Sequence, residues 1–295
     1  MAKYCEELEH APIVFNEDGT IEYGSNVSSA SPRIELVHRE NQSWLYTGNC
    51  IELLDAICQK YPEGRFDTIF ADPPYFLSNG GVTCHAGKMV KVNKGDWDRS
   101  QGAEINHEFN LSWLERAQRA LNKNGTIWVS GTQHVIFSIG YAMQQLGFKI
   151  LNMISWEKPN PPPNLSCRYF THSTEILLWA AKTEKSKHFF NYPAMKAENS
   201  GKQMKSVWKI SAPSSREKKF GKHPTQKPEA LLRRCLQAST PPSGWVFDPF
   251  LGSGTTAVAA RDLNLNFAGI DLSREYVDIA VARLSSEDAQ QLPHL

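Results

Sequence analysis

The stretch WVFDPFLGSGTTAVAARDLNLNFAGID, residues 245–271, contains the pattern that decides the fold of this chain. An apolar run of strand length leads into a glycine-rich turn and a helical run at 257–263, and a second apolar run then ends at Asp271. Glycine lets the backbone approach a ligand closely because it has no Cβ, and the helix N-terminus behind the turn offers free N–H groups. An acid at the end of the second strand suits a ribose hydroxyl pair. The order of these elements predicts a nucleoside site, and a plain tight turn is the alternative.

The same alternation of strands and helices extends outward to about residue 45. Phe109, Trp113, Ala117 and Leu121 recur at every fourth position, as on one side of a helix, while Pro228 and Ser273 suit the starts of two further helices. Strands alternating with helices predict an α/β fold with a doubly wound, mainly parallel seven-stranded sheet. The predicted strands are apolar runs at 44–47, 67–71, 126–130, 150–156, 175–181, 246–248 and 267–271.

A second pattern, Asp72-Pro-Pro-Tyr75, directly follows the apolar run 68–71. The carboxyl ends of strands are where doubly wound sheets place their sites. Two prolines fix the backbone and remove two N–H donors, which leaves carbonyl groups aimed outward. An acid, rigid carbonyls and an aromatic ring therefore predict an acceptor-rich pocket with a stacking wall. A proline turn beside a core tyrosine is the alternative.

Composition sets broad limits on the class of protein. With 295 residues and 41% hydrophobic content, the chain can bury a sizeable core, and its net charge of +1 names no partner. Six cysteines occur without a C-x-x-C pair or zinc-ligand spacing, which predicts reduced thiols in a cytoplasmic protein and no metal site. We expect neither a secretion signal nor a membrane span. The predicted organisation is a polar N-terminal arm at 1–40 and a single domain at 41–295.

Residues 182–222 are strongly basic. Their 11 Lys or Arg and 3 Asp or Glu give 11 − 3 = +8, which leaves 1 − 8 = −7 for the rest of the chain, and five aromatic residues interleave with the charges. An isolated lysine-rich run is usually a solvated loop. Between the two patterns above, it favours contact with DNA phosphates. Residues 76–103 are long for a loop in a compact domain and predict a second inserted segment that contacts DNA.

Together these patterns resemble the amino-group DNA methyltransferases. Asp-Pro-Pro-Tyr and the Phe-x-Gly-x-Gly of 250–254 are similar to their motifs IV and I, and His-Pro-Thr-Gln-Lys-Pro at 223–228 is similar to motif X. The order of the motifs resembles the beta class. Segments 72–81, 94–98 and 164–175 look closest to GATC adenine methyltransferases of the DpnA type, and HinfI-type enzymes look more distant. Asn49 departs from the pattern, which has Asp at that position.

The resemblance implies a Rossmann-like methyltransferase fold, S-adenosyl-L-methionine as cofactor, and site-specific methylation of adenine N6. Asp72 and the Pro73 carbonyl would each accept one hydrogen of the amine, and Tyr75 would stack on the flipped-out base. The implied catalytic residues are Asp72, Pro73, Pro74 and Tyr75. The implied cofactor-binding residues are Asn49, Asp72, His223, Thr225, Lys227, Asp248, Phe250, Gly252, Ser253, Gly254, Thr255 and Asp271. The candidate DNA-binding residues are Lys88, Lys91, Lys94, Arg168, Lys202, Lys205, Lys218 and Lys219.

The expected partner is double-stranded DNA, with single-stranded DNA and a homodimer as further expectations, and the expected setting is a restriction–modification system with GATC as target. Three alternatives stay open at this point. Cytosine N4 methylation would use the same machinery, although Ser in place of Asp72 would resemble that class. Methylation of RNA or of a protein amide is the second alternative. A DNA-binding module without enzymatic activity is the third, but it leaves the glycine turn and Asp271 unexplained.

Overall fold

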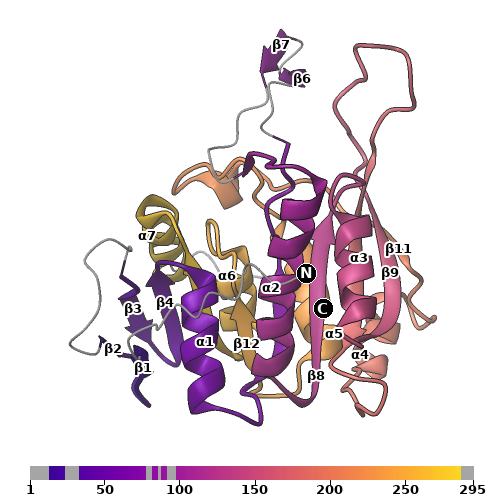
Figure 1. Ribbon diagram of the computed structural model, residues 1–295. Coiled ribbons are helices and arrows are strands. Elements are labelled where there is room, and N and C mark those ends of the chain that lie inside the picture. The colour runs from indigo at the N-terminus through magenta and orange to yellow at the C-terminus, as the bar shows by residue number, and fades with distance from the viewer. Residues whose placement is uncertain (1–12, 24–32, 78–81, 86–87, 92–97, 287–295) are drawn as a thin grey trace.

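Most of the chain folds around one sheet. The computed structural model describes residues 13–23, 33–77, 82–85, 88–91 and 98–286, with only the backbone described for 82–85 and 88–91. Within these residues nine strands form a single sheet (Figure 1). Their spatial order is β11 (Val207–Lys209), β9 (Lys149–Glu157), β10 (Thr174–Ala181), β8 (Leu121–Gly131), β5 (Phe66–Ala71), β12 (Trp245–Asp248), β13 (Asn266–Asp271), β4 (Ser43–Thr47) and β3 (Glu35–Glu40).

The directions of the strands decide where the site forms. β8, β5, β12, β13 and β4 pair in parallel, whereas β10 is antiparallel to both of its neighbours and β3 is antiparallel to β4. β9 therefore runs with the parallel group, and β11 pairs with it in parallel. All seven predicted strands lie in this sheet, and the mainly parallel α/β architecture is confirmed. The sheet differs from a seven-stranded one because β3 and β11 extend its two edges.

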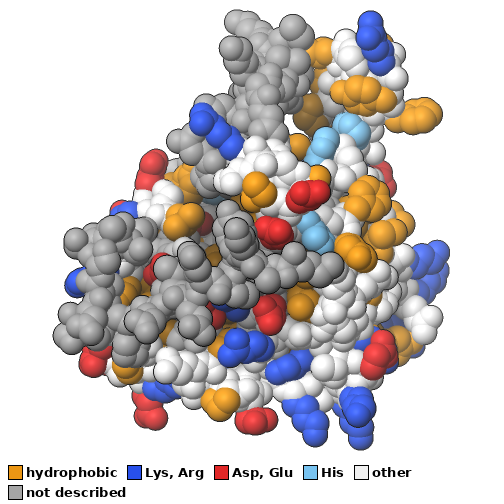
Figure 2. All heavy atoms as spheres, viewed as in Figure 1, with side chains coloured by type: hydrophobic (Ala, Val, Ile, Leu, Met, Phe, Trp, Pro, Cys, Tyr) orange, Lys and Arg blue, Asp and Glu red, His pale blue; other side chains and the backbone are white. Residues whose placement is uncertain are grey.

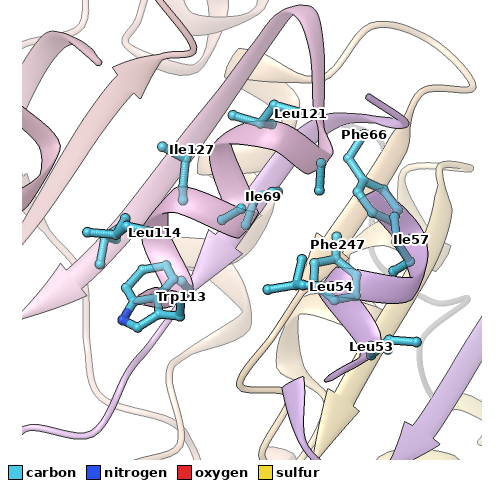
Figure 3. Packing of buried hydrophobic residues seen from close by; sticks show 14 of the residues in the cluster. Leu53, Leu54, Ile57, Phe66, Ile69, Trp113, Leu114, Leu121, Ile127 and Phe247 are labelled. Atoms are coloured by element: carbon cyan, nitrogen blue, oxygen red, sulfur yellow. The ribbon is translucent and has the colours of Figure 1, made fainter. Parts of the chain in front are cut away.

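Helices cover both faces of the sheet and create two cores. α1 (Cys50–Lys60), α2 (Ala103–Ala120) and α3 (Ile136–Gln145) lie on one face, and α5 (Glu229–Ser239), α6 (Thr255–Asp262) and α7 (Arg274–Leu284) lie on the other. Successive strand residues alternate between the cores, as the two-residue period of a strand requires: Ile69 belongs to the first and Phe70 to the second. In Figure 3, side chains of α1 and α2, among them Leu54 and Trp113, lie beside Phe247 and other residues of the central strands.

The N-terminal residues contribute more to the fold than a polar arm would. β3 pairs with β4 along the edge of the main sheet. A hairpin of β1 (Ile13–Phe15) and β2 (Ile21–Tyr23) packs through Phe15, which is buried beside Trp44 and Tyr46. β1 and β2 are only three residues long and lie in a stretch rich in polar residues, so composition alone predicted a polar arm. The predicted boundary at residue 40 therefore falls between the paired strands β3 and β4.

Residues 182–222 also differ from the expected single inserted segment. β10 is antiparallel to β8, whereas β5 is parallel to β8. β10 therefore ends at the end of the sheet where β5 begins, far from the carboxyl end of β5. There the Lys182 N–H donates to the Gly125 carbonyl at 3.0 Å, and the Ser186 hydroxyl donates to the Lys123 carbonyl at 2.8 Å. The chain then forms α4 (Tyr192–Glu198), which packs on α5. Through β11 it runs back towards the carboxyl edge, which is the end of the sheet where the parallel strands finish, and it reaches η2 (Arg216–Lys218).

None of the described helices is both long enough and apolar enough to cross a bilayer.

Candidate active site

The central polar side chains of the molecule gather at one edge of the sheet. β5, β8, β12 and β13 are parallel, so their carboxyl ends meet there, and antiparallel β10 begins there. This arrangement brings the residue after β5, the ends of β8 and β12, and the start of β10 together. Binding sites of doubly wound sheets form at such carboxyl ends. The residues concerned are Asp72, Ser130, Asp248 and Glu175.

Asp72 is held by three donors. Its Oδ1 accepts hydrogen bonds from the Tyr75 hydroxyl at 2.6 Å and from the Ser130 hydroxyl. Its Oδ2 accepts one from the Lys227 ammonium, whose Nζ lies 2.5 Å away. Burial alone would raise the pKa of Asp72, but the Lys227 charge and the hydrogen bonds from Lys227, Ser130 and Tyr75 outweigh burial and hold the pKa below its usual value. Asp72 is therefore an anion at neutral pH.

A second carboxylate completes the cluster. Glu175 pairs with the Lys158 ammonium, and its Oε2 lies 3.7 Å from Lys227 Nζ and 3.4 Å from the Tyr75 hydroxyl. Burial would lower the pKa of Lys227, but the Asp72 and Glu175 charges raise it above the usual lysine value. Two carboxylates and two ammonium groups thus form a buried, electrically balanced group, in which Lys227 and Glu175 have side-chain exposures of 6% and 13%.

The backbone after Asp72 is fixed by a carboxylate from the far end of the 76–103 segment. Asp98, which is fully buried, accepts hydrogen bonds from the Tyr75 N–H at 2.9 Å and from the Leu77 N–H at 3.1 Å. The Tyr75 ring is itself buried, with Lys227 Nζ 5.2 Å from its centroid. Burial raises the pKa of the Tyr75 hydroxyl well above its usual value, and the Asp72 and Glu175 charges add to this. Tyr75 therefore serves here as a hydrogen-bond donor to Asp72, which is a role beyond the predicted stacking.

The glycine turn between β12 and α6 depends on its glycines. Gly252 and Gly254 have φ angles of +51° and +76°, and a Cβ on Gly254 would lie 2.5 Å from the Cβ of Ala280. Asp248 closes the turn by accepting from the Phe250 N–H at 2.9 Å and from the Thr256 hydroxyl at 2.5 Å. Burial raises the pKa of Asp248 to about 7 against the lowering effect of these two bonds.

Two predicted cofactor residues point towards a buried arginine. Arg283, on α7, donates from Nη1 to the Ser253 hydroxyl at 3.2 Å, to the Ser253 carbonyl at 2.8 Å and to the Thr255 hydroxyl at 3.0 Å. Its Nη2 donates to Glu229 Oε1 at 2.9 Å. The side chains of Ser253 and Thr255 therefore hold the turn in place.

The remaining cofactor candidates lie around the same turn. Asp271 accepts from the Gly252 N–H at 2.8 Å and from the Ser273 N–H at 2.9 Å, and burial raises its pKa. The His223 ring packs on Tyr276, with centroids 4.3 Å apart, and lies 3.3 Å from where a Cβ of Gly252 would stand. Asn49 accepts from the Ile51 N–H at 2.9 Å and so caps α1. Glycines without Cβ, a helix N-terminus and the Asp271 carboxylate are groups that fit a nucleoside cofactor.

The other three candidates make contacts outside the glycine turn. Phe250 packs edge-on against Trp113 of α2, with ring centroids 5.3 Å apart. Thr225 uses its carbonyl to accept from Lys227 Nζ at 3.3 Å. Lys227 was assigned to the cofactor by the motif, whereas the structure places its ammonium on the Asp72 carboxylate.

The candidate DNA-binding residues come from several separate segments of the chain. Arg168 is exposed on the loop between β9 and β10, and Lys219 is exposed near η2, with Nζ 4.8 Å from the Phe220 ring centroid. Lys202 and Lys205 are exposed between α4 and β11. Lys88 and Lys91 belong to the backbone of β7 (Lys88–Lys91), which pairs with β6 (Val82–His85), and Lys94 lies outside the described residues. Trp208, one of the interleaved aromatics, is buried against Trp128 and is a core residue.

Sequence analysis did not single out Ser130, Glu175, Lys158, Asp98 or Arg283. Ser130 ends a predicted strand, Glu175 begins another, and Lys158 comes two residues after a third. Their position at strand ends was therefore a usable signal. This signal does not give the order and direction of the strands, so it could not show which strand ends meet.

Comparison with known proteins identifies the family of the chain that forms this site. The model of the DNA methylase family N6_N4_Mtase matches residues 66–282. The chain is 56% identical over 223 residues to the Type II methyltransferase M2.DpnII of Streptococcus pneumoniae, covering 75% of this chain and 83% of that protein. It is 47% identical over 239 residues to M2.MboI of Moraxella bovis, covering 81% and 86%.

Solved structures agree with this assignment. The M1.HpyAVI–SAM complex superposes with a TM-score of 0.63 at 30% identity, covering 83% of this chain and all of that one. The cytosine-N4-specific PvuII DNA methyltransferase, at 18% identity, shares the fold with a TM-score of 0.67 and covers 86% and 92%. The predicted family and the predicted cofactor, S-adenosylmethionine, are confirmed. The strand-end carboxylates and the glycine turn are thus those of an S-adenosylmethionine-dependent DNA methyltransferase, and the chain belongs to the N6_N4_Mtase family of DNA methylases.

Proposed function

We propose that this enzyme methylates N6 of an adenine flipped out of double-stranded DNA, within GATC, as the modification enzyme of a restriction–modification system. The observation that carries the proposal is the ionised Asp72 carboxylate at the same sheet edge as the glycine turn. The target GATC rests on the resemblance to DpnA-type enzymes. Identity of 47–56% to three Type II methyltransferases supports the restriction–modification setting. The cytoplasmic location and the homodimer stay predictions.

The proposed chemistry has to overcome the low nucleophilicity of the target amine. An exocyclic amine is a poor nucleophile because its lone pair is delocalised into the ring. Asp72 accepts one N–H and the Pro73 carbonyl accepts the other, which turns the lone pair out of the ring plane and stabilises the charge that develops on nitrogen. When bound, S-adenosylmethionine would supply an electrophilic methyl group to this nitrogen, and its sulfur would keep the electron pair of the broken carbon–sulfur bond. The nitrogen then loses one proton, and Asp72 is the carboxylate placed to accept it.

Asp72 also separates the proposal from cytosine N4 methylation. Asp at position 72 resembles the adenine-directed version of the motif. Ser at this position would instead resemble the cytosine-directed version. PvuII methyltransferase shares less than a fifth of its residues with this chain, so it informs the fold alone.

The proposed base can be identified directly. Expression in a host lacking DNA methylation, followed by nucleoside mass spectrometry and sequencing of modified bases, should give N6-methyladenine in GATC. The Asp72→Asn variant is the control for host background. N4-methylcytosine would contradict the proposed base, and N6-methyladenine in another sequence would contradict the proposed target alone.

Two projections beside the carboxyl edge are suited to DNA. Figure 1 shows the β6–β7 hairpin and the loop between β9 and β10 extending from the same end of the molecule. The second loop is closed at its base by the Lys158 N–H, which donates to the Ser173 carbonyl at 2.8 Å. Its outer part exposes Phe170, at 96%, together with Tyr169 and Arg168, and Figure 2 shows basic and hydrophobic side chains there. Such side chains suit phosphate contact and stacking.

Lys218 and Lys219 test the contribution of η2 to DNA binding. We expect Lys218→Ala with Lys219→Ala to weaken DNA binding and to reduce the slope of log affinity against log salt by about 0.9 per lost phosphate contact. The matched control removes two lysines near the opposite edge, Lys60→Ala with Lys123→Ala. Fluorescence anisotropy at several salt concentrations measures both variants. Equal slopes for the two variants and the wild type would exclude phosphate contacts by η2.

A further inference from the structure

The acceptor sites of Asp72 are nearly all occupied. An ionised carboxylate offers about four lone-pair sites, two on each oxygen. Within the described part of the chain, two hydroxyl donors take both sites of Oδ1, and the Lys227 ammonium takes one site of Oδ2. The remaining site belongs to Oδ2. A target amine that binds without displacing a donor must therefore be accepted by this oxygen.

Lys227 is placed to keep that site available. Its three N–H donors face Asp72 Oδ2 at 2.5 Å, the Thr225 carbonyl at 3.3 Å and Glu175 Oε2 at 3.7 Å. These contacts come from the residue after β5, from the segment before α5 and from the start of β10, so the ammonium is fixed between two carboxylates. A carboxylate buried without a paired cation takes up a proton, and its protonated oxygen then donates instead of accepting. The cation therefore decides whether Asp72 can accept from an amine.

We propose that Lys227, held by Glu175, is the positioning residue of the catalytic carboxylate: it keeps Asp72 an anion with one open acceptor site, on Oδ2, for the amine of the target base. The proposal rests on the proposed function, because it concerns an amine as substrate. It assigns Lys227 to the chemistry of the methyl acceptor, whereas the motif resemblance assigned it to the cofactor. Lys158 supports the arrangement from the other side of Glu175.

Several charged groups surround Asp72 and bear on its protonation. Lys227 lies before α5, Glu175 begins β10 and pairs with Lys158, the Tyr75 hydroxyl follows β5, and Asp248 ends β12. Asp248 contributes its own titration, since burial raises its pKa to about 7. The protonation of Asp72 is therefore judged from the difference between the pH profiles of variant and wild type, both measured at saturating cofactor and DNA.

The decisive variant is Lys227→Met, which removes the ammonium and keeps an unbranched side chain. In the wild type the pKa of Asp72 lies below its usual value, so the active anion persists throughout pH 5.5–8.5 (a range of about three units). Without Lys227, burial is no longer outweighed and the pKa of Asp72 rises. The single-turnover rate should then fall by about tenfold for each pH unit below the new pKa and recover at high pH.

Three comparisons make the test specific. Lys227→Arg keeps a cation and should retain the wild-type pH profile at a reduced rate. Glu175→Gln leaves Lys227 on Asp72 and should lower the rate without adding an acid limb. Lys123→Met makes the same chemical change at the far end of β8 and should change nothing.

Calorimetry with S-adenosylmethionine separates the two assignments of Lys227. The Lys227→Met variant should bind the cofactor within about threefold of the wild-type affinity, which is under 1 kcal/mol. A rate loss of the same factor at every pH would reduce Lys227 to a structural role, and a large loss of cofactor affinity would return it to the cofactor site. If the Met variant does not fold, a wild-type pH profile in Lys227→Arg together with a new acid limb in Lys227→Gln supports the proposal, and no new limb in Lys227→Gln overturns it. Wild-type protein that methylates no adenine would instead refute the proposed function.

Discussion

Replacing Asp72 by Asn should slow methyl transfer by at least about a thousandfold while cofactor affinity stays within about threefold of the wild type. Removing a single preorganised group that stabilises developing charge costs about 10²–10³ in rate, and Asn at this position also loses the proton acceptor. The amide keeps the size of the side chain and can still accept from Lys227. Single-turnover methylation of a DNA duplex and calorimetry with S-adenosylmethionine measure the two quantities.

The choice of Asn over Ala follows from the structure. Asp72→Ala would remove the nearest carboxylate from Lys227, whose side chain is 6% exposed. Breaking a buried ion pair by removing one partner costs about 3–5 kcal/mol of folding free energy. Loss of activity in the Ala variant would then mix catalysis with stability. Asp55→Asn, which alters a partly exposed ion pair with Arg116, is the matched control. Turnover near the wild-type rate in Asp72→Asn would refute the catalytic assignment.

Replacing Arg283 by Met should lower the free energy of unfolding by about 3–5 kcal/mol, because Glu229 loses its buried partner and the hydroxyl groups of the glycine turn lose their donor. The side chain of Arg283 is 3% exposed, so water does not replace these contacts. The turn that carries Gly252 should also lose definition, and affinity for S-adenosylmethionine should fall with it. Urea unfolding, followed by circular dichroism with and without the cofactor, measures both effects.

Arg274 supplies the control on the same helix. It begins α7, and its ion pairs with Asp278 and Glu35 are exposed to solvent. Exposed pairs contribute about 0–1 kcal/mol, so Arg274→Met should change stability little. The double variant Arg283→Met with Glu229→Gln removes both charges and should recover part of the loss. Equal effects of the Arg283 and Arg274 substitutions would show that burial of the pair does not matter.

Local sequence was a good guide wherever a residue's role depends on its own strand or turn. The seven predicted strands exist because runs such as 67–71 can be buried on both faces, and such runs are visible in sequence. Asp72, Asp248 and Asp271 were predicted as site residues because each stands at the end of one of these strands. The glycine turn was predicted because glycine has no Cβ, and the same property lets Gly252 and Gly254 adopt the positive φ found in the structure.

Predictions that depended on composition were less accurate. Residues 182–222 have a net charge of +8, yet their first part lies at the end of the sheet opposite Asp72, because β10 runs antiparallel to β8. Trp208 was counted among the aromatic residues that interleave with the basic charges, but it is a core side chain. Charge counted along a chain does not reveal the direction in which the chain crosses the sheet.

The sequence by itself determined the α/β class, the glycine turn, the Asp-Pro-Pro-Tyr segment and the family, because each depends on residues adjacent in the chain. Tertiary structure alone decided which distant residues join Asp72 in one charged cluster. Ser130, Glu175 and Lys227 come from points 58, 103 and 155 residues further along the chain, and Ser130 and Glu175 reach Asp72 through the sheet order β10-β8-β5. Which strands become neighbours is set by packing of the whole core, and a buried ion pair forms only after that packing has excluded water from both charges.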